Sequence, residues 1–101
     1  MIDEAEITEV ANLASAKKRI RQNERIRRRN RARKTMVKNV TTKFLQAIHS
    51  GELQLADQLL SRVTKKLDQV AAKGTLHRNT VSRRKSRLAR RLNVARAQAT
   101  G

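Results

Sequence analysis

The chain has 101 residues, of which 25 are Lys or Arg and 8 are Asp or Glu, so its formal net charge is +17. Cysteine, proline, tryptophan and tyrosine are absent and there is one phenylalanine, which excludes disulfide scaffolds, Cys-ligated zinc sites and folds that stack bases on several aromatic rings. This length allows one domain, and this charge indicates a polyanionic partner, either nucleic acid or an anionic membrane surface.

The sequence shows no targeting or membrane-spanning segment. The longest apolar run has three residues, Val70 to Ala72, where a membrane span needs about 20. Residues 1–14 contain four acids and no base, whereas organelle transit peptides are rich in Arg and poor in acids. We therefore expect a cytoplasmic protein; a plastid location stays open.

Two internal glycines, Gly51 and Gly74, divide the chain into three stretches rich in helix-forming residues. They predict helices at about 14–49, 52–73 and 77–97, with Ser50 and either Thr75 or Asn79 as N-caps. The predicted fold is an all-α three-helix bundle, like a spectrin repeat, formed by one domain over residues 14–97. Residues 1–13 form an acidic extension that we expect to be disordered, and residues 98–101 form a short tail.

Apolar residues at helical spacing predict the core. The second helix has the cleanest apolar stripe, the third a narrow one, and the first an apolar face in its second half only. The predicted core residues are Met36, Val37, Val40, Phe44, Leu45, Ala47, Ile48, Ala56, Leu59, Leu60, Val63, Leu67, Val70, Ala71, Val81, Leu88, Leu92 and Ala95.

The first half of the first helix is basic on every side, and Glu24 is its only acid. A solvated helix usually alternates Glu with Lys, so this composition favours anion binding over a solvated surface. Because such a helix has no core to join, we expect residues 14–34 to be disordered when free and to order on binding. The predicted nucleic-acid-binding residues here are Lys17, Lys18, Arg19, Arg21, Arg25, Arg27, Arg28, Arg29, Asn30, Arg31, Arg33 and Lys34.

A second basic block lies in the third helix and contains no acid. Two basic surfaces on different helices would let one small protein bridge two nucleic-acid segments. The predicted contacts of this block are His77, Arg78, Asn79, Arg83, Arg84, Lys85, Ser86, Arg87, Arg90 and Arg91.

Nothing in the sequence has the pattern of a catalytic or metal site. His49 and His77 lack carboxylate or Cys partners at ligand spacing, and Asp57 and Asp68 are interpreted as solvated or ion-paired charges. We expect no enzymatic activity and no cofactor.

Three segments resemble one family: residues 11–19 (ANLASAKKR), 28–32 (RRNRA) and, most specifically, 74–88 (GTLHRNTVSRRKSRL). The chain is similar there to bacterial ribosomal protein S20, in order and without gaps from about residue 11 to 94. The resemblance implies a three-helix bundle that binds small-subunit (16S-type) ribosomal RNA directly and early in assembly, with the residues of the two basic blocks given above as its RNA contacts. It also implies that the protein bridges the five-prime domain and the penultimate helix of that RNA, with other small-subunit proteins as neighbours. We expect a monomer when free.

One departure from the family pattern is the extension that precedes Val10, which carries four acids. We expect a disordered overhang; an alternative start, a segment that competes with RNA and a contact with a basic neighbouring protein stay open.

Two other function classes are weighed against the ribosomal one. An architectural or zipper-type DNA binder is the main alternative, although the apolar stripe over residues 36–48 is shorter than a coiled coil needs. A membrane-surface peptide needs an apolar face opposite its basic face, and the most basic segment has none.

Overall fold

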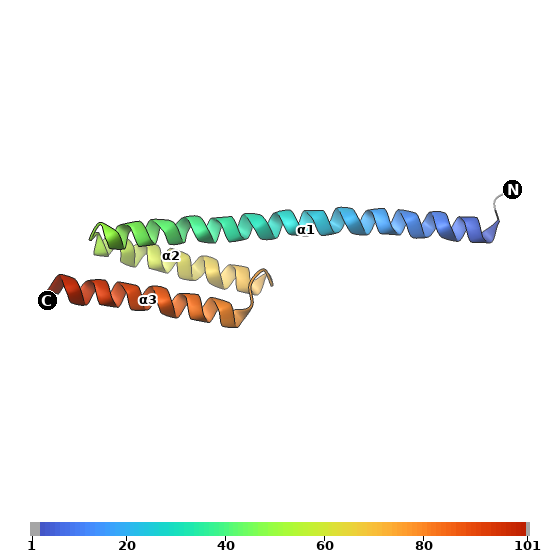
Figure 1. The fold of residues 1–101 in the computed structure, drawn as a ribbon. Helices are drawn as coiled ribbons and strands as arrows, with labels where there is room; N and C mark the ends of the chain where they lie inside the picture. The colour runs from blue at the N-terminus through green and yellow to red at the C-terminus, as the bar shows by residue number, and fades with distance from the viewer. Residues whose placement is uncertain (1–2, 101) are drawn as a thin grey trace. The chain divides into compact units, whose positions relative to one another are not determined.

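The computed structural model describes residues 3–100 and contains three α-helices: α1 (Glu4–His49), α2 (Leu53–Ala72) and α3 (Arg78–Thr100) (Figure 1). The predicted all-α class with three helices is confirmed. The chain divides into two units, Met1–Arg31 and Ala32–Gly101, and α1 contributes residues to both.

The two predicted glycine stops end α1 and α2. Gly51 and Gly74 both have φ of +75°, the left-handed conformation that favours glycine. At the end of α1, the backbone N–H of Gly51 donates to the Ile48 carbonyl at 3.1 Å, and that of Glu52 donates to the Ala47 carbonyl at 2.9 Å. The same pair of bonds recurs around Gly74, so both helices end in a Schellman motif that satisfies their last carbonyls.

The first helix begins at Glu4, ten residues before the predicted start. Asp3 caps it, because the Asp3 Oδ1 accepts the Ala5 backbone N–H at 2.8 Å, and Glu4 and Glu6 in the first turn favour the positive end of the helix dipole. Residues 4–13, expected to be disordered, are therefore helical, as are residues 14–34. This segment has a capped end and contains neither Gly nor Pro, and both features favour a helix. Met1 and Ile2 lie outside the described residues.

The second helix lies within one residue of its predicted bounds, but its start differs in detail. Its N-cap is Glu52, whose carbonyl accepts the Ala56 N–H at 2.9 Å, and not the predicted Ser50. Glu52 makes no side-chain capping bond. Gly51 ends α1 one residue after Ser50, so Ser50 belongs to the end of α1 and cannot begin α2.

The third helix is capped by a residue that was predicted only as an RNA contact. The His77 Nδ1 accepts the Asn79 backbone N–H at 3.1 Å, so His77 is the N-cap in place of Thr75 or Asn79. The helix continues to Thr100, which makes residues 98–100 helical where a tail was predicted. Gly101 lies outside the described residues.

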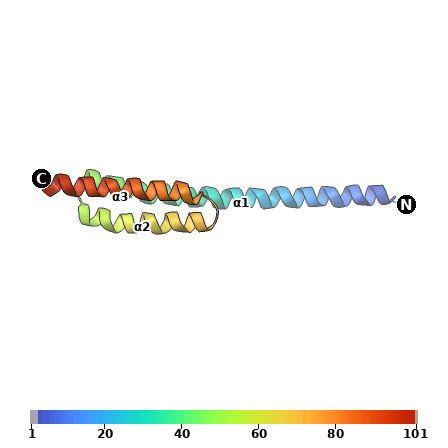
Figure 2. The same ribbon diagram turned by 90° about the horizontal axis from the view of Figure 1, so that it is seen from below.

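The unit 32–101 has one hydrophobic core, to which all three helices contribute. Residues 32–49 of α1 lie beside α2 and α3 in both views (Figures 1 and 2). Among the described residues of this unit, every buried side chain is apolar. The buried residues, all of them predicted, are Val37, Phe44, Ala47, Ala56, Leu59, Val63, Leu67, Val70, Val81, Leu88 and Leu92.

The remaining predicted core residues lie at its margin. Val40, Leu45, Ile48, Leu60 and Ala71 are half-buried against the core. Ala95 is half-buried as well, whereas Met36 is 45% exposed and does not belong to the core.

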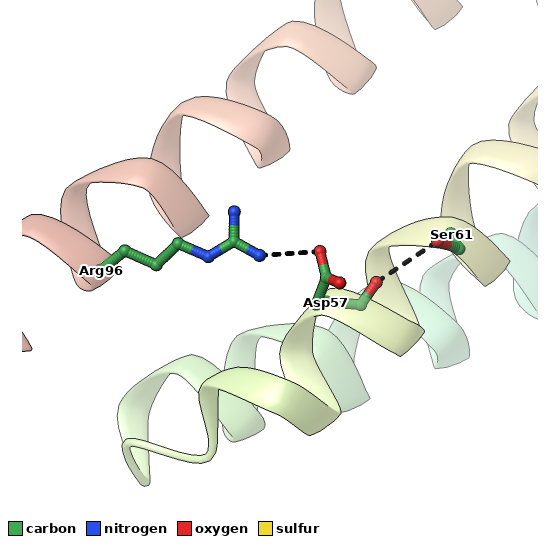
Figure 3. A network of polar contacts seen from close by, with 3 residues as sticks. All are labelled: Asp57, Ser61 and Arg96. Carbon is green, nitrogen blue, oxygen red and sulfur yellow. Dashed lines mark hydrogen bonds and ion pairs between the residues drawn. The ribbon is translucent and has the colours of Figure 1, made fainter.

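Two exposed ion pairs join α2 to α3. The Arg96 Nη2 donates to the Asp57 Oδ1 at 2.9 Å, and the Ser61 hydroxyl donates to the main-chain oxygen of Asp57 at 3.4 Å (Figure 3). The Lys85 Nζ donates to the Asp68 Oδ1 at 2.8 Å. Both aspartates are thus ion-paired, as one of the two interpretations of the sequence predicted.

The unit 1–31 has no core of its own. Every described side chain in it is exposed except Asn30, which is half-buried. Its apolar side chains are exposed too, including Ile7, Val10 and Leu13 at 57–66%. Among residues 3–100, no helix combines the length and apolar character needed to cross a membrane.

Candidate nucleic-acid interface

The basic first half of α1 displays its cations on all sides. Between Lys17 and Arg31 every Lys and Arg is exposed, and Glu24 is the only acid. At about 100° per residue their positions surround the helix axis, so no side of this segment is left for a protein partner to cover. The arrangement is suited to phosphates that approach from more than one direction.

The basic residues of α3 are exposed with one exception. Lys85 is half-buried and pairs with Asp68, so the structure gives this predicted RNA contact a partner within the protein. By contrast, Arg84, Arg87 and Arg91 lie at i, i+3 and i+7, which places them on one face of α3.

That face of α3 meets α1 across a groove of about 550 Å³, which we call the α1–α3 groove. Among the described residues that line it, none is acidic. Its basic rim is formed by Lys34, Lys38, Arg84, Arg87 and Arg91. Its apolar floor is formed by Val37, Leu45, Leu67, Leu76 and Leu88, and Thr41 and Thr42 complete the wall on α1.

Four of the five rim residues were predicted from the sequence as RNA contacts, and the structure brings them together from two helices. Lys34 comes from the end of the first basic block and the three arginines from the second. Five cations around one groove repel one another, so an anion bound between them relieves that repulsion.

A second groove, of about 310 Å³, lies between α1 and α2. Arg33, Lys66 and Lys73 line it together with Met36, which explains why Met36 is exposed. Arg33 is half-buried and its Nη1 donates to the Thr75 hydroxyl at 3.4 Å. This predicted RNA contact therefore lies against the loop that precedes α3.

Three of these basic residues were missed in the sequence. Lys38 follows Lys34 by four positions, so helical spacing already placed both on one face of α1. Lys66 on α2 and Lys73, which caps the end of α2, lie outside the two dense basic blocks, and their position opposite Arg33 depends on how α2 docks on α1.

Among residues 3–100, no three His, Cys, Asp or Glu side chains are grouped as a metal site would require. The interface consists of cations, hydroxyl groups and apolar surface. Such groups can neutralise phosphates and accept or donate hydrogen bonds.

Comparison with known proteins identifies relatives over most of the chain. The model of the family described as ribosomal protein S20 matches residues 11–93. Small ribosomal subunit protein bS20 of Mycobacterium leprae (strain Br4923) is 42% identical over 84 residues, which cover 83% of this chain and 98% of that protein. The protein of the same name from Mycobacterium ulcerans (strain Agy99) is 43% identical over 84 residues, covering 83% and 97%.

Proposed function

The chain belongs to the ribosomal protein S20 family, so it is a structural component of the small ribosomal subunit, and we propose that its basic surfaces bind small-subunit ribosomal RNA directly. The family match carries this conclusion. Membership places the protein in the ribosomes of the bacterial cytoplasm and makes it a structural protein and not an enzyme. The match gives no support to an architectural DNA-binding role.

The proposed mechanism is neutralisation of closely spaced phosphates. The exposed cations of α1 between Lys17 and Arg31 form one contact surface, and the rim of the α1–α3 groove forms a second. Arginine predominates in both, and its guanidinium group binds two phosphate oxygens at once. Two surfaces of this kind can hold two RNA segments, for which the five-prime domain and the penultimate helix are the proposed partners.

A matched pair of charge variants of the full chain tests the proposal. Arg87→Gln removes a cation from the groove rim, whereas Lys85→Gln removes one that pairs with Asp68. Each lowers the net charge by one. We expect Arg87→Gln to weaken binding to folded small-subunit ribosomal RNA several-fold. The slope of log affinity against log salt should become shallower by about one unit, because one phosphate contact is lost. Lys85→Gln should change the affinity and the slope much less.

Binding is measured by filter retention over a salt series, with folding of each variant checked by circular dichroism. Equal losses for the two variants would show that only net charge matters and that the groove rim is not a contact surface.

A further inference from the structure

Phosphate neutralisation accounts for the rim of the α1–α3 groove but not for its floor. Phosphate oxygens need cations and hydrogen-bond donors, and they gain nothing from apolar surface. Leu45 and Leu76 are half-buried at the floor, where they leave apolar surface open to the groove. The volume of about 550 Å³ lies within the range of small-molecule sites. The groove therefore suits a ligand with both an anionic and an apolar part.

The hydroxyl groups of Thr41 and Thr42 on the α1 wall further restrict which ligands would complement the groove. The Thr41 Oγ1 donates to the Val37 carbonyl at 2.8 Å, and the Thr42 Oγ1 donates to the Lys38 carbonyl at 2.9 Å. While each hydroxyl hydrogen is donated to the helix backbone, the hydroxyl oxygen can only accept a hydrogen bond from a ligand. A ligand that complements them must bring its own O–H or N–H donor.

An unpaired ribonucleotide has these features together. Its phosphate is anionic, its base has a broad apolar face, and its 2′-hydroxyl is a donor that deoxyribose lacks. Arginine guanidinium planes also stack on bases, and Arg84 and Arg87 lie at the rim. Within a duplex the base is stacked and paired, so only a nucleotide from a loop or bulge could enter.

We propose that the α1–α3 groove binds one unstacked ribonucleotide of the RNA, with its base on the floor, its phosphate at the rim and its 2′-hydroxyl donating to Thr41. This inference rests on the proposed RNA-binding function and deepens it. The groove would then distinguish an unpaired ribonucleotide from duplex RNA and from DNA, which a surface that binds by charge alone would not do.

The test titrates the methyl-labelled full chain with single nucleotides and follows it by NMR. The probes are the four nucleoside 5′-monophosphates, their 2′-deoxy forms and ribose 5-phosphate. At least one nucleoside monophosphate should shift the methyl resonances of Leu45 and Leu76, ribose 5-phosphate should not, and the deoxy form should bind about fivefold more weakly, as loss of one hydrogen bond predicts.

Three variants complete the design. Thr41→Val should abolish the preference for ribose over deoxyribose, and Thr41→Ser, which keeps the acceptor oxygen, should retain it. Thr64→Val changes the same group at a half-buried position of α2 that does not line the groove, so it should leave the preference intact.

The inference is overturned if no nucleotide shifts the floor methyl groups more than ribose 5-phosphate does, or if Thr41→Val keeps the ribose preference. Binding of the same sample to folded small-subunit ribosomal RNA distinguishes failure of the nucleotide site from failure of the proposed function. Retained RNA binding with an empty groove overturns the nucleotide site alone, whereas loss of RNA binding by the unmodified chain overturns the proposed function.

Discussion

Two glycine residues determine where α1 and α2 end. Gly51 and Gly74 adopt the left-handed conformation, which costs other residues about 1–2 kcal/mol. Apart from the glycine and its two chain neighbours, no heavy atom lies within 4 Å of the position that a Cβ would occupy at either glycine. The restriction on these positions is therefore conformational and not steric, and both turns need glycine although both have room for a side chain.

We expect Gly51→Ala and Gly74→Ala each to lower the free energy of unfolding by about 1 kcal/mol, since part of the conformational cost is offset by a less flexible unfolded chain. Urea denaturation followed by circular dichroism measures the change. Gln54→Ala, at an exposed position inside α2, should alter stability by less than about 0.5 kcal/mol. Glycine variants as stable as the unmodified chain would contradict the account of the turns.

The capping role of His77 could not be predicted from the sequence. Its neighbours predicted an RNA contact, and the structure shows its ring capping α3 through the Asn79 backbone N–H. The glycine stops were predictable because only a residue without a Cβ suits that conformation. Histidine is not among the usual capping residues, so its role depends on a side-chain orientation that the sequence does not specify.

Helix α1 contains two segments that are stabilised by different interactions. From Val37 to Ile48 its apolar face packs into the core, whereas every side chain of residues 3–29 is exposed, so that segment depends on backbone hydrogen bonds and local propensity. Helices without tertiary packing open readily.

We therefore expect backbone amides of residues 7–29 to exchange with solvent at least about a hundredfold faster than those of residues 41–48 in the free protein. Hydrogen exchange with mass spectrometry resolves the two segments. Binding of small-subunit ribosomal RNA should slow exchange in residues 17–31 most, because the exposed cations lie there. Uniform protection along α1 before RNA is added would contradict this description of the helix.

The pairing of α2 with α3 could be predicted only in part. Apolar spacing predicted the stripes that meet, because burial depends on residue type and period alone. The partners of Asp57 and Asp68 could not be predicted, since Arg96 and Lys85 are 39 and 17 positions away and reach them only when the helices dock in one register. Being exposed, each pair contributes at most about 1 kcal/mol.

At the scale of the whole molecule, the fold gathers charge that the chain distributes over distant segments. The two basic blocks were evident from the sequence because charge density needs no coordinates. That Lys34 shares a groove with Arg84, Arg87 and Arg91 was not evident, and neither was the position of Lys66 and Lys73 opposite Arg33. Those relations depend on how the helices dock. The apolar stripes predict that the helices pack together, but they do not determine the register of the packing.

We propose that this chain binds folded small-subunit ribosomal RNA by neutralising many phosphates. The most direct test is the affinity of the purified full chain for that RNA over a salt series, with duplex DNA and an unrelated structured RNA as competitors. If about ten phosphates are neutralised, log affinity should fall with log salt at a slope of roughly −7 to −9, and the complex should survive both competitors. A slope shallower than about −3, or equal affinity for all three nucleic acids, would contradict the claim.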